Sequence, residues 1–284
     1  MNLSKTTKLG STGFTVSRIG TGTNRWAYGE NDEPAYEAYR TLLDRGISFF
    51  DTAEIYTNGR SERLLGECHR RDGRPAVLAS KYRPSEDRST GKAFTEALDA
   101  TLSRLRVETL DLYYIHMPPT TGSIEVLMEY MAEAHESGKI RSVGVSNFSA
   151  EQMRRAADQL EKHGIPLAAN QVEYSLSHRE PERDGVLEAC RELGASLVAY
   201  RPLSRGTLAS QAGGGRVDEA LRVIADRHGV TPSQVALAWL LRRDEVIIPI
   251  PGATKREHAL QNADALNLSL RDDEWADLSQ LPTP

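Results

Sequence analysis

The sequence predicts an α/β fold, a (β/α)8 TIM barrel with an N-terminal β-hairpin that closes the barrel floor and with extra helices near the C-terminus. Three observations support this prediction. Eight short apolar segments alternate with helical stretches, several helical stretches end in a glycine, and polar residues collect directly after the apolar segments. Because strands that alternate with helices favour a parallel sheet, and because there are eight of them, we expect a closed barrel rather than an open doubly wound sheet.

The predicted elements follow one another along the chain. The segment TKLGSTGFTVSRIG alternates around Gly10 and Gly13, which is typical of a hairpin. We expect eight strands at residues 19–22, 48–52, 77–81, 112–116, 142–146, 168–172, 196–200 and 246–250. Two helices are expected between the last two strands, at residues 217–228 and 231–241, and a closing helix at residues 272–281.

Residue types with particular backbone preferences mark the helix boundaries. The segments LLDRGISFFD, ESGKIRSVGVSN, KHGIPLAANQ and RELGASLVAY each predict a helix that stops at glycine and a strand that starts at once, because glycine adopts the left-handed conformation at little cost. Ser149 with Gln152, and Thr231 with Gln234, have the spacing of capping boxes, which predicts that helices begin there.

Composition limits the partners that we expect. The formal net charge of −5 provides no basic surface for nucleic acid, and no apolar run approaches the roughly 18 residues of a membrane span. Cys68 and Cys190 lie in charged helical segments without metal-ligand spacing nearby, so we expect reduced thiols and no metal site. We therefore expect one domain over residues 1–284, located in the cytoplasm, with a small-molecule partner; the oligomeric state stays open.

Polar side chains end six of the eight predicted strands, at Asp51, Lys81, His116, Ser146 with Asn147, Gln171 and Tyr200. In a barrel of this kind the C-terminal ends of the strands form the active-site face. Asp51 and Lys81 end consecutive strands and can pair, since a buried charge needs a partner. A charged lysine beside a phenol lowers the pKa of the phenol, and Tyr56, in the loop after Asp51, is the candidate phenol. Glu54 in the same loop has no assigned role and is expected to be solvated.

These residue types favour carbonyl reduction. A tyrosine acid can protonate an oxygen that becomes negative in the transition state, and His116 can donate a second hydrogen bond to that oxygen. A Schiff-base lyase fits less well, because an acid beside Lys81 keeps the amine charged. We find no cluster of metal ligands and no GxSxG nucleophile elbow, and GTGTNRWAYG lacks the GxGxxG spacing of a dinucleotide-binding turn.

The motifs DTAEIY, LASKY, YYIHMP, GVSNF, NQVEYS and AYRPLSRG occur in this order and together resemble the aldo-keto reductases over nearly the whole chain. The resemblance implies a (β/α)8 barrel that binds NADPH without a Rossmann fold and reduces aldehydes or ketones by direct hydride transfer. It implies that Tyr56 is the general acid, that Asp51 and Lys81 lower its pKa, and that His116 orients the carbonyl. The family also includes regulatory subunits of potassium channels, so a non-catalytic nicotinamide-binding subunit is the alternative.

The resemblance further implies how the cofactor is held. Ser146, Asn147 and Gln171 match positions that hold the nicotinamide carboxamide, and Tyr200 matches the aromatic residue that stacks on the ring. Further cofactor contacts are expected at Arg201, Leu203, Arg205, Gly252, Thr254, Lys255, His258, Gln261 and Asn262. Arg201 either contacts the pyrophosphate or points to solvent.

The segment IPGATKREHALQN departs from the family pattern where the 2′-phosphate is expected. Gly252 and Ala253 replace a lysine and a serine of many members, and His258 replaces an arginine. Lys255 and Arg256 either supply the positive charge or are simply exposed to solvent, so we expect NADPH, with NADH as the alternative. Three aromatic residues are expected either to contact substrate or to pack at the rim, namely Trp26, Tyr28 and Phe148.

Overall fold

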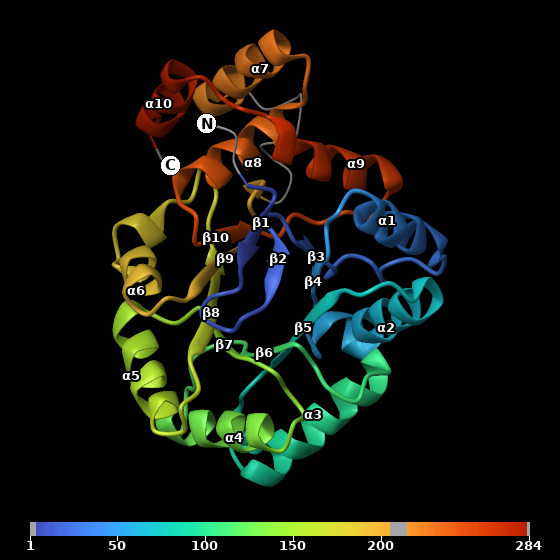
Figure 1. Cartoon of the computed structure of the whole chain (residues 1–284), viewed down its shortest axis with the longest axis vertical. Coiled ribbons are helices and arrows are strands. Elements are labelled where there is room, and N and C mark those ends of the chain that lie inside the picture. The colour runs from blue at the N-terminus through green and yellow to red at the C-terminus, as the bar shows by residue number, and fades with distance from the viewer. Residues whose placement is uncertain (1–3, 205–214, 283–284) are drawn as a thin grey trace.

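The computed structural model describes residues 4–204 and 215–282. Eight parallel strands stand in the order β10-β9-β8-β7-β6-β5-β4-β3, with helices around the outside (Figure 1). A parallel bridge between Gly22 and Gly252 joins the two ends of this order and closes the barrel. The predicted (β/α)8 barrel is confirmed. Its strands are β3 (Thr21–Gly22), β4 (Phe49–Asp51), β5 (Val77–Tyr82), β6 (Leu112–Ile115), β7 (Val143–Ser146), β8 (Leu167–Glu173), β9 (Ser196–Tyr200) and β10 (Ile247–Pro249).

The first and last strands of the barrel are shorter than the predicted segments at residues 19–22 and 246–250. Where these two segments meet, the backbone N–H groups of Gly20 and Gly22 donate to the carbonyls of Pro249 and Pro251, at 2.9 and 3.2 Å. The two prolines have no N–H to donate in return. Regular pairing is therefore limited at this seam.

Ten described helices pack around the barrel and at one side of it (Figure 1). The glycines expected to stop helices all have positive φ angles, at Gly46, Gly138, Gly164 and Gly194. Both expected capping boxes form, at Ser149 and Thr231. The helices are α1 (Glu33–Asp44), α2 (Arg60–Asp72), α3 (Gly91–Leu105), α4 (Ile124–Glu136), α5 (Ala150–Glu161), α6 (Val186–Glu192), α7 (Arg216–His228), α8 (Pro232–Arg243), α9 (Arg256–Asp264) and α10 (Asp272–Gln280).

An antiparallel hairpin of β1 (Thr6–Lys8) and β2 (Thr15–Ser17) closes the barrel floor, as predicted. Leu9 and Val16 are buried in the cluster that fills the barrel. Gly10 lies against the chain at Ala168, where an added Cβ would be 2.3 Å from the carbonyl oxygen. Only glycine fits this close approach, and its φ of +52° also favours glycine.

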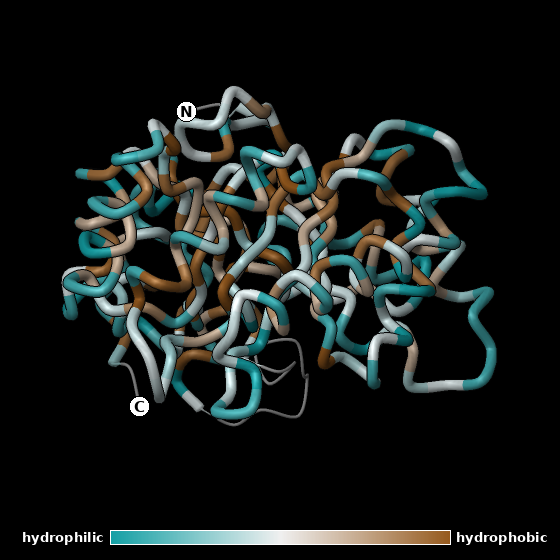
Figure 2. Tube along the Cα trace, turned by 90° about the horizontal axis from the view of Figure 1, so that it is seen from below, coloured by the Kyte–Doolittle hydropathy of each residue, from teal (hydrophilic) through white to brown (hydrophobic). Residues whose placement is uncertain are grey.

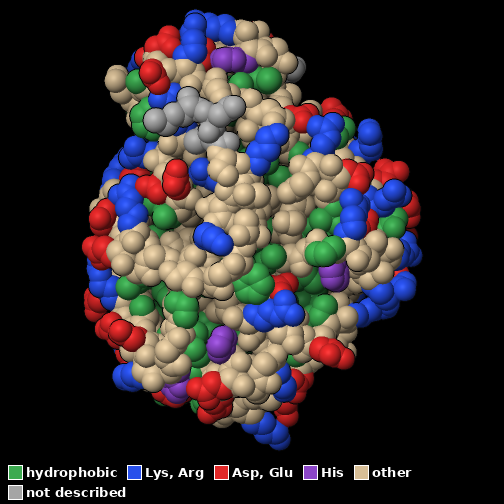
Figure 3. All heavy atoms as spheres, viewed as in Figure 1, with side chains coloured by type: hydrophobic (Ala, Val, Ile, Leu, Met, Phe, Trp, Pro, Cys, Tyr) green, Lys and Arg blue, Asp and Glu red, His purple; other side chains and the backbone are tan. Residues whose placement is uncertain are grey.

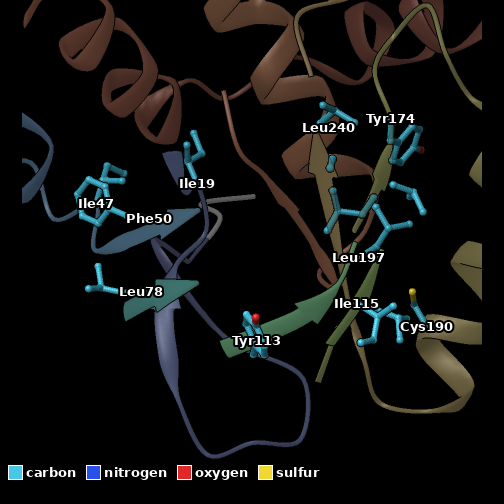
Figure 4. Packing of buried hydrophobic residues seen from close by; sticks show 14 of the residues in the cluster. Ile19, Ile47, Phe50, Leu78, Tyr113, Ile115, Tyr174, Cys190, Leu197 and Leu240 are labelled. Carbon is cyan, nitrogen blue, oxygen red and sulfur yellow. The ribbon is translucent and has the colours of Figure 1, made fainter. Parts of the chain in front are cut away.

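Side chains alternate between two apolar layers. Phe50, Leu78, Tyr113 and Ile115 face the helices (Figure 4), whereas their chain neighbours Phe49, Ala79, Leu112 and Tyr114 fill the barrel. The hydropathy view shows apolar segments gathered inside and hydrophilic segments on the outer helices and loops (Figure 2). The same alternation places the next inward positions, Asp51 and Lys81, on the barrel side of their strands.

The outer helices carry charged side chains of both signs, which are intermixed on the face shown in Figure 3. Of the helices that the structure describes, none is long and apolar enough to cross a membrane. Cys68 and Cys190 are both free and buried, and burial raises the pKa of each thiol to about 12.

Candidate active site

Four polar side chains meet at the C-terminal end of the barrel. Asp51 ends β4, Lys81 lies near the end of β5, His116 follows β6, and Tyr56 begins a short 3-10 turn after β4. The Lys81 Nζ donates to Asp51 Oδ1 at 2.5 Å and to the Thr52 carbonyl at 2.7 Å. The same Nζ lies 5.1 Å from the ring centroid of Tyr56, and the Tyr56 and His116 rings are 5.8 Å apart.

Lys81 and Asp51 form an ion pair that is almost completely shielded from solvent. Burial by itself lowers the pKa of Lys81, but the attraction of Asp51 and Tyr56 outweighs it and the pKa lies above its ordinary value. Burial raises the pKa of Asp51, and Lys81 and Gln171 oppose that rise by donating to its two oxygens. Lys81 therefore stays charged beside the phenol.

The pKa of Tyr56 differs from the sequence-based expectation. Burial raises it, and the attraction of Lys81 lowers it by less, so the pKa lies above the ordinary value of 10.0. The sequence motifs pointed to the lysine but contained no measure of how deeply the phenol is enclosed. The consequence is a phenol that keeps its proton on Oη throughout the neutral pH range.

His116 is neutral in this environment. Burial lowers its pKa to about 3, and the charges of Lys81 and Arg83 act in the same direction. Its buried Nδ1 has no hydrogen-bond partner among the described residues, while its backbone N–H donates to the Tyr82 carbonyl at 2.8 Å. A neutral imidazole can donate one hydrogen bond to a substrate oxygen without adding a positive charge to the site.

The residues expected at the nicotinamide form one hydrogen-bonded chain that reaches Asp51. The Tyr200 hydroxyl donates to Asn147 Oδ1 at 3.0 Å, and Asn147 Nδ2 donates to Ser146 Oγ at 3.0 Å. Ser146 Oγ then donates to the Gln171 carbonyl at 2.8 Å, and Gln171 Nε2 donates to Asp51 Oδ2 at 2.8 Å. The link from Gln171 to Asp51 was not predicted, and it joins the expected cofactor site directly to the ion pair.

Three of the expected cofactor contacts follow β9, namely Arg201, Leu203 and Arg205. Arg201 pairs with Glu173 at 2.8 Å, and its guanidinium stands 5.5 Å from the Tyr200 ring centroid. An acid of the same rim thus meets its charge, and a contact of Arg201 with the cofactor pyrophosphate stays a prediction. Leu203 is half-buried against the outer apolar layer, and Arg205 lies outside the described residues.

The segment expected at the cofactor phosphate leads into α9. Lys255 and Arg256 are exposed at the start of this helix, and neither makes an ion pair with a described residue. Unpaired cations at a helix N-terminus suit a phosphate group. Asn262 is buried and donates to the Gly252 carbonyl at 3.2 Å, whereas Gln261 donates weakly to Glu257 and Thr254 lies 3.5 Å from His258.

The three aromatic residues expected either at the substrate or at the rim differ in exposure. Trp26 is 5% exposed and donates its indole N–H to the Ala253 carbonyl at 2.8 Å. Phe148 is 1% exposed and belongs to the layer between strands and helices. Both side chains pack inside the protein, and substrate contact at Trp26 and Phe148 stays a prediction. Tyr28, at 69% exposed, is the accessible residue of the three.

Glu54 corrects a second expectation, that of a solvated loop acid. Its side chain is 9% exposed and forms a two-pronged ion pair with Arg88, at 2.8 and 2.9 Å. Glu54 Oε1 also accepts the backbone N–H of Arg83 at 2.7 Å. This group, the Glu54–Arg88 clamp, ties the loop that carries Tyr56 to the loop after β5. No local motif marks it, because its partners are far apart in the sequence.

The described residues contain no group of three or more histidine, cysteine or acidic side chains that could hold a metal ion. The polar groups of the site are instead a protonated phenol, a neutral imidazole and a buried ion pair. Such a set can donate a proton and a hydrogen bond to an oxygen atom that gains negative charge.

The chain is similar in sequence to known proteins over most of its length. A sequence profile of the Aldo/keto reductase family matches residues 18–282. An aldo-keto reductase of Schizosaccharomyces pombe, whose name specifies NADP(+), is 33% identical over 282 residues, which cover 86% of this chain and 82% of the relative. A probable aldo-keto reductase of Glycine max is 31% identical and covers 95% of this chain and 87% of its own.

Solved structures are similar over almost the whole chain. A thermostable aldo-keto reductase bound to the inhibitor epalrestat has a TM-score of 0.85 and 35% identity, with 96% of this chain and 98% of that chain covered. An aldo/keto reductase of Klebsiella pneumoniae, in complex with NADP and acetate, has a TM-score of 0.83 and 33% identity, with 99% and 96% covered.

Proposed function

Because the chain belongs to the aldo/keto reductase family, we propose that it is an NADPH-dependent oxidoreductase that reduces aldehydes or ketones to alcohols, with Tyr56 as the general acid. One observation carries the proposal: a protonated phenol, a neutral imidazole and a buried lysine–aspartate pair meet at the active-site end of the barrel. Relatives that carry NADP in their structure or name support the choice of cofactor.

The geometry of the side chains supports the following roles. Tyr56 holds a proton on Oη and releases it to the substrate oxygen as that oxygen becomes negative. Lys81, with its Nζ 5.1 Å from the Tyr56 ring centroid, stabilises the phenolate that remains. His116 donates a hydrogen bond that orients the same oxygen, and Asp51 keeps Lys81 charged and directed inward.

The cofactor supplies the hydride when it is bound. Ser146, Asn147 and Gln171 would hold the nicotinamide carboxamide, and the half-buried ring of Tyr200 would lie against the nicotinamide. Lys255 and Arg256 would meet the 2′-phosphate at the start of α9, since their charges are unpaired within the described chain. This last contact is what favours NADPH over NADH.

The test is NADPH consumption with a panel of aromatic aldehydes. We expect Tyr56→Phe to lower kcat by about 100-fold or more, because the substituted ring has no proton to give. NADPH affinity should change little. Tyr36→Phe is the matched control, because Tyr36 lies on α1 beside Arg71, on the outside of the barrel, and its loss of a hydroxyl should leave turnover unchanged.

Two results would argue against the proposal. Tight NADPH binding without turnover of any carbonyl compound would favour the non-catalytic, nicotinamide-binding alternative. Full activity of Tyr56→Phe would show that another group provides the proton.

A further inference from the structure

Arg83 lies at the mouth of the barrel beside His116. Strands β5 and β6 pair in register with Lys81 opposite Tyr114 and Tyr82 opposite Ile115. The His116 N–H donates to the Tyr82 carbonyl at 2.8 Å, so the pairing continues to the next residue of each strand. Arg83 and His116 therefore occupy neighbouring positions at the active-site end.

The alternation along β5 sets the side on which Arg83 stands. Lys81 faces the interior of the barrel, where it pairs with Asp51. Tyr82 faces outward and packs against Phe94 of α3, with ring centroids 5.1 Å apart. Arg83 is the next residue, so it returns to the side of Lys81. Its charge contributes to lowering the pKa of His116, which agrees with this placement.

The backbone of Arg83 is held from both directions by the Glu54–Arg88 clamp. Glu54 Oε1 accepts its N–H at 2.7 Å, and Arg88 donates to its carbonyl at 3.2 Å. These two hydrogen bonds fix the backbone from which the Arg83 side chain extends.

Arg83 as a whole residue is half-buried, and its guanidinium makes no hydrogen bond or ion pair with any residue that the structure describes. The neighbouring cations, by contrast, each have an acidic counter-ion. Lys81 pairs with Asp51, Arg88 with Glu54, and Arg201 with Glu173. Glu54 is already occupied by Arg88 and by the backbone of Arg83. A guanidinium without a counter-ion among the described residues, at the mouth of the barrel, is suited to receive an anionic group from a ligand.

We propose that Arg83 binds the carboxylate of the substrate, so that this enzyme preferentially reduces aldehydes or ketones that also carry a carboxylate group. The planar guanidinium can donate two parallel hydrogen bonds to a carboxylate. The exposed apolar side chain of Ile55 precedes Tyr56, and that of Met117 follows His116. These two side chains favour an apolar spacer between the carbonyl and the carboxylate. This inference rests on the proposed function.

The experiment compares charged and neutral substrates of matched shape. The 2-, 3- and 4-carboxybenzaldehydes are each assayed with NADPH beside their methyl esters, for the native enzyme, Arg83→Gln, Arg83→Lys and Arg63→Gln. The last is the charge-matched control, since Arg63 is exposed on α2. We expect the native enzyme to prefer at least one acid over its ester. Arg83→Gln should lower that ratio of kcat/KM values by about 10- to 100-fold, mainly through KM, with Arg83→Lys in between.

Several outcomes would overturn the inference. Equal kcat/KM values for all acids and esters in the native enzyme would show that no anion subsite exists. An equal loss for acid and ester in Arg83→Gln would mean that Arg83 acts through His116, and a rise confined to the KM for NADPH would assign Arg83 to the cofactor. Failure of the native enzyme to reduce any of the esters or acids would instead refute the proposed function on which the inference rests.

Discussion

At the scale of single residues, the site depends on a balance between burial and charge at Tyr56. Burial raises the pKa of the phenol and Lys81 opposes that rise, so the phenol is a proton donor whose conjugate base is still stabilised. Lys81 can do this only while Asp51 holds it charged, because burial alone would lower the pKa of the lysine. Asp51 also accepts from Gln171 and thereby meets two donors at once.

Asp51→Asn tests the role of the counter-ion of Lys81. An asparagine side chain offers one acceptor oxygen where two donors now bind, and it removes the counter-ion of Lys81. We expect kcat for reduction to fall by about 10- to 100-fold as Lys81 loses its charge. In the native enzyme, reduction should show no transition near pH 6.5, because His116 is already neutral there, and should decline only above pH 10.0.

The pH dependence of kcat and the NADPH affinity of Asp51→Asn together check this prediction. Loss of the lysine charge should move the alkaline decline of the variant to still higher pH, with NADPH affinity largely kept. A collapse of NADPH binding together with the melting temperature would identify Asp51 as a residue needed for the fold rather than for proton transfer.

At the scale of elements, strand ends and the loops after them assemble the site. The capping boxes and helix-stopping glycines could be predicted because they depend on residues close together in the sequence. The Glu54–Arg88 clamp could not, because it joins the loop after β4 to the loop after β5. It anchors the segment that presents Tyr56, so its effect should be visible in both stability and catalysis.

Glu54→Gln tests the role of this clamp. The variant has one acceptor oxygen where two now accept from Arg88, and it loses the negative charge in a largely buried place. We therefore expect the free energy of unfolding to fall by about 1–3 kcal/mol. kcat should fall as well, because the loop with Tyr56 is held less firmly. Glu86→Gln is the control, an exposed acid of the neighbouring loop. Denaturant unfolding and steady-state kinetics measure both effects, and equal values for the two variants would contradict the proposed anchoring.

At the scale of the whole molecule, one end of the barrel contributes to stability and the other carries the candidate active site. The hairpin closes the floor with Leu9 and Val16, while the catalytic candidates stand at the opposite end. This separation lets the floor stabilise the fold without touching the site. That residues 1–284 fold as one domain, and that the protein is cytoplasmic, stay predictions.

Gly10→Ala should therefore reduce stability but not chemistry. The added methyl group would meet the Ala168 carbonyl at 2.3 Å in a backbone conformation that disfavours alanine. We expect a loss of about 1–3 kcal/mol in the free energy of unfolding, with kcat unchanged at temperatures where the variant stays folded. Gly13→Ala separates the two causes, because Gly13 has a φ of +82° but no atom within 4 Å of the added Cβ. Equal losses in both variants would show that the close approach is unimportant.

The sequence by itself determined the barrel, the order of its elements and the strand ends at which Asp51, Lys81 and His116 stand, because alternation, caps and helix stops are local properties. Only the tertiary structure decided that Trp26 and Phe148 are enclosed and that Glu54 is clamped by Arg88. It also decided that Gln171 reaches Asp51 and that burial outweighs Lys81 at Tyr56. Burial and charge pairing depend on which distant segments surround a side chain, and that surrounding exists only once the barrel has closed.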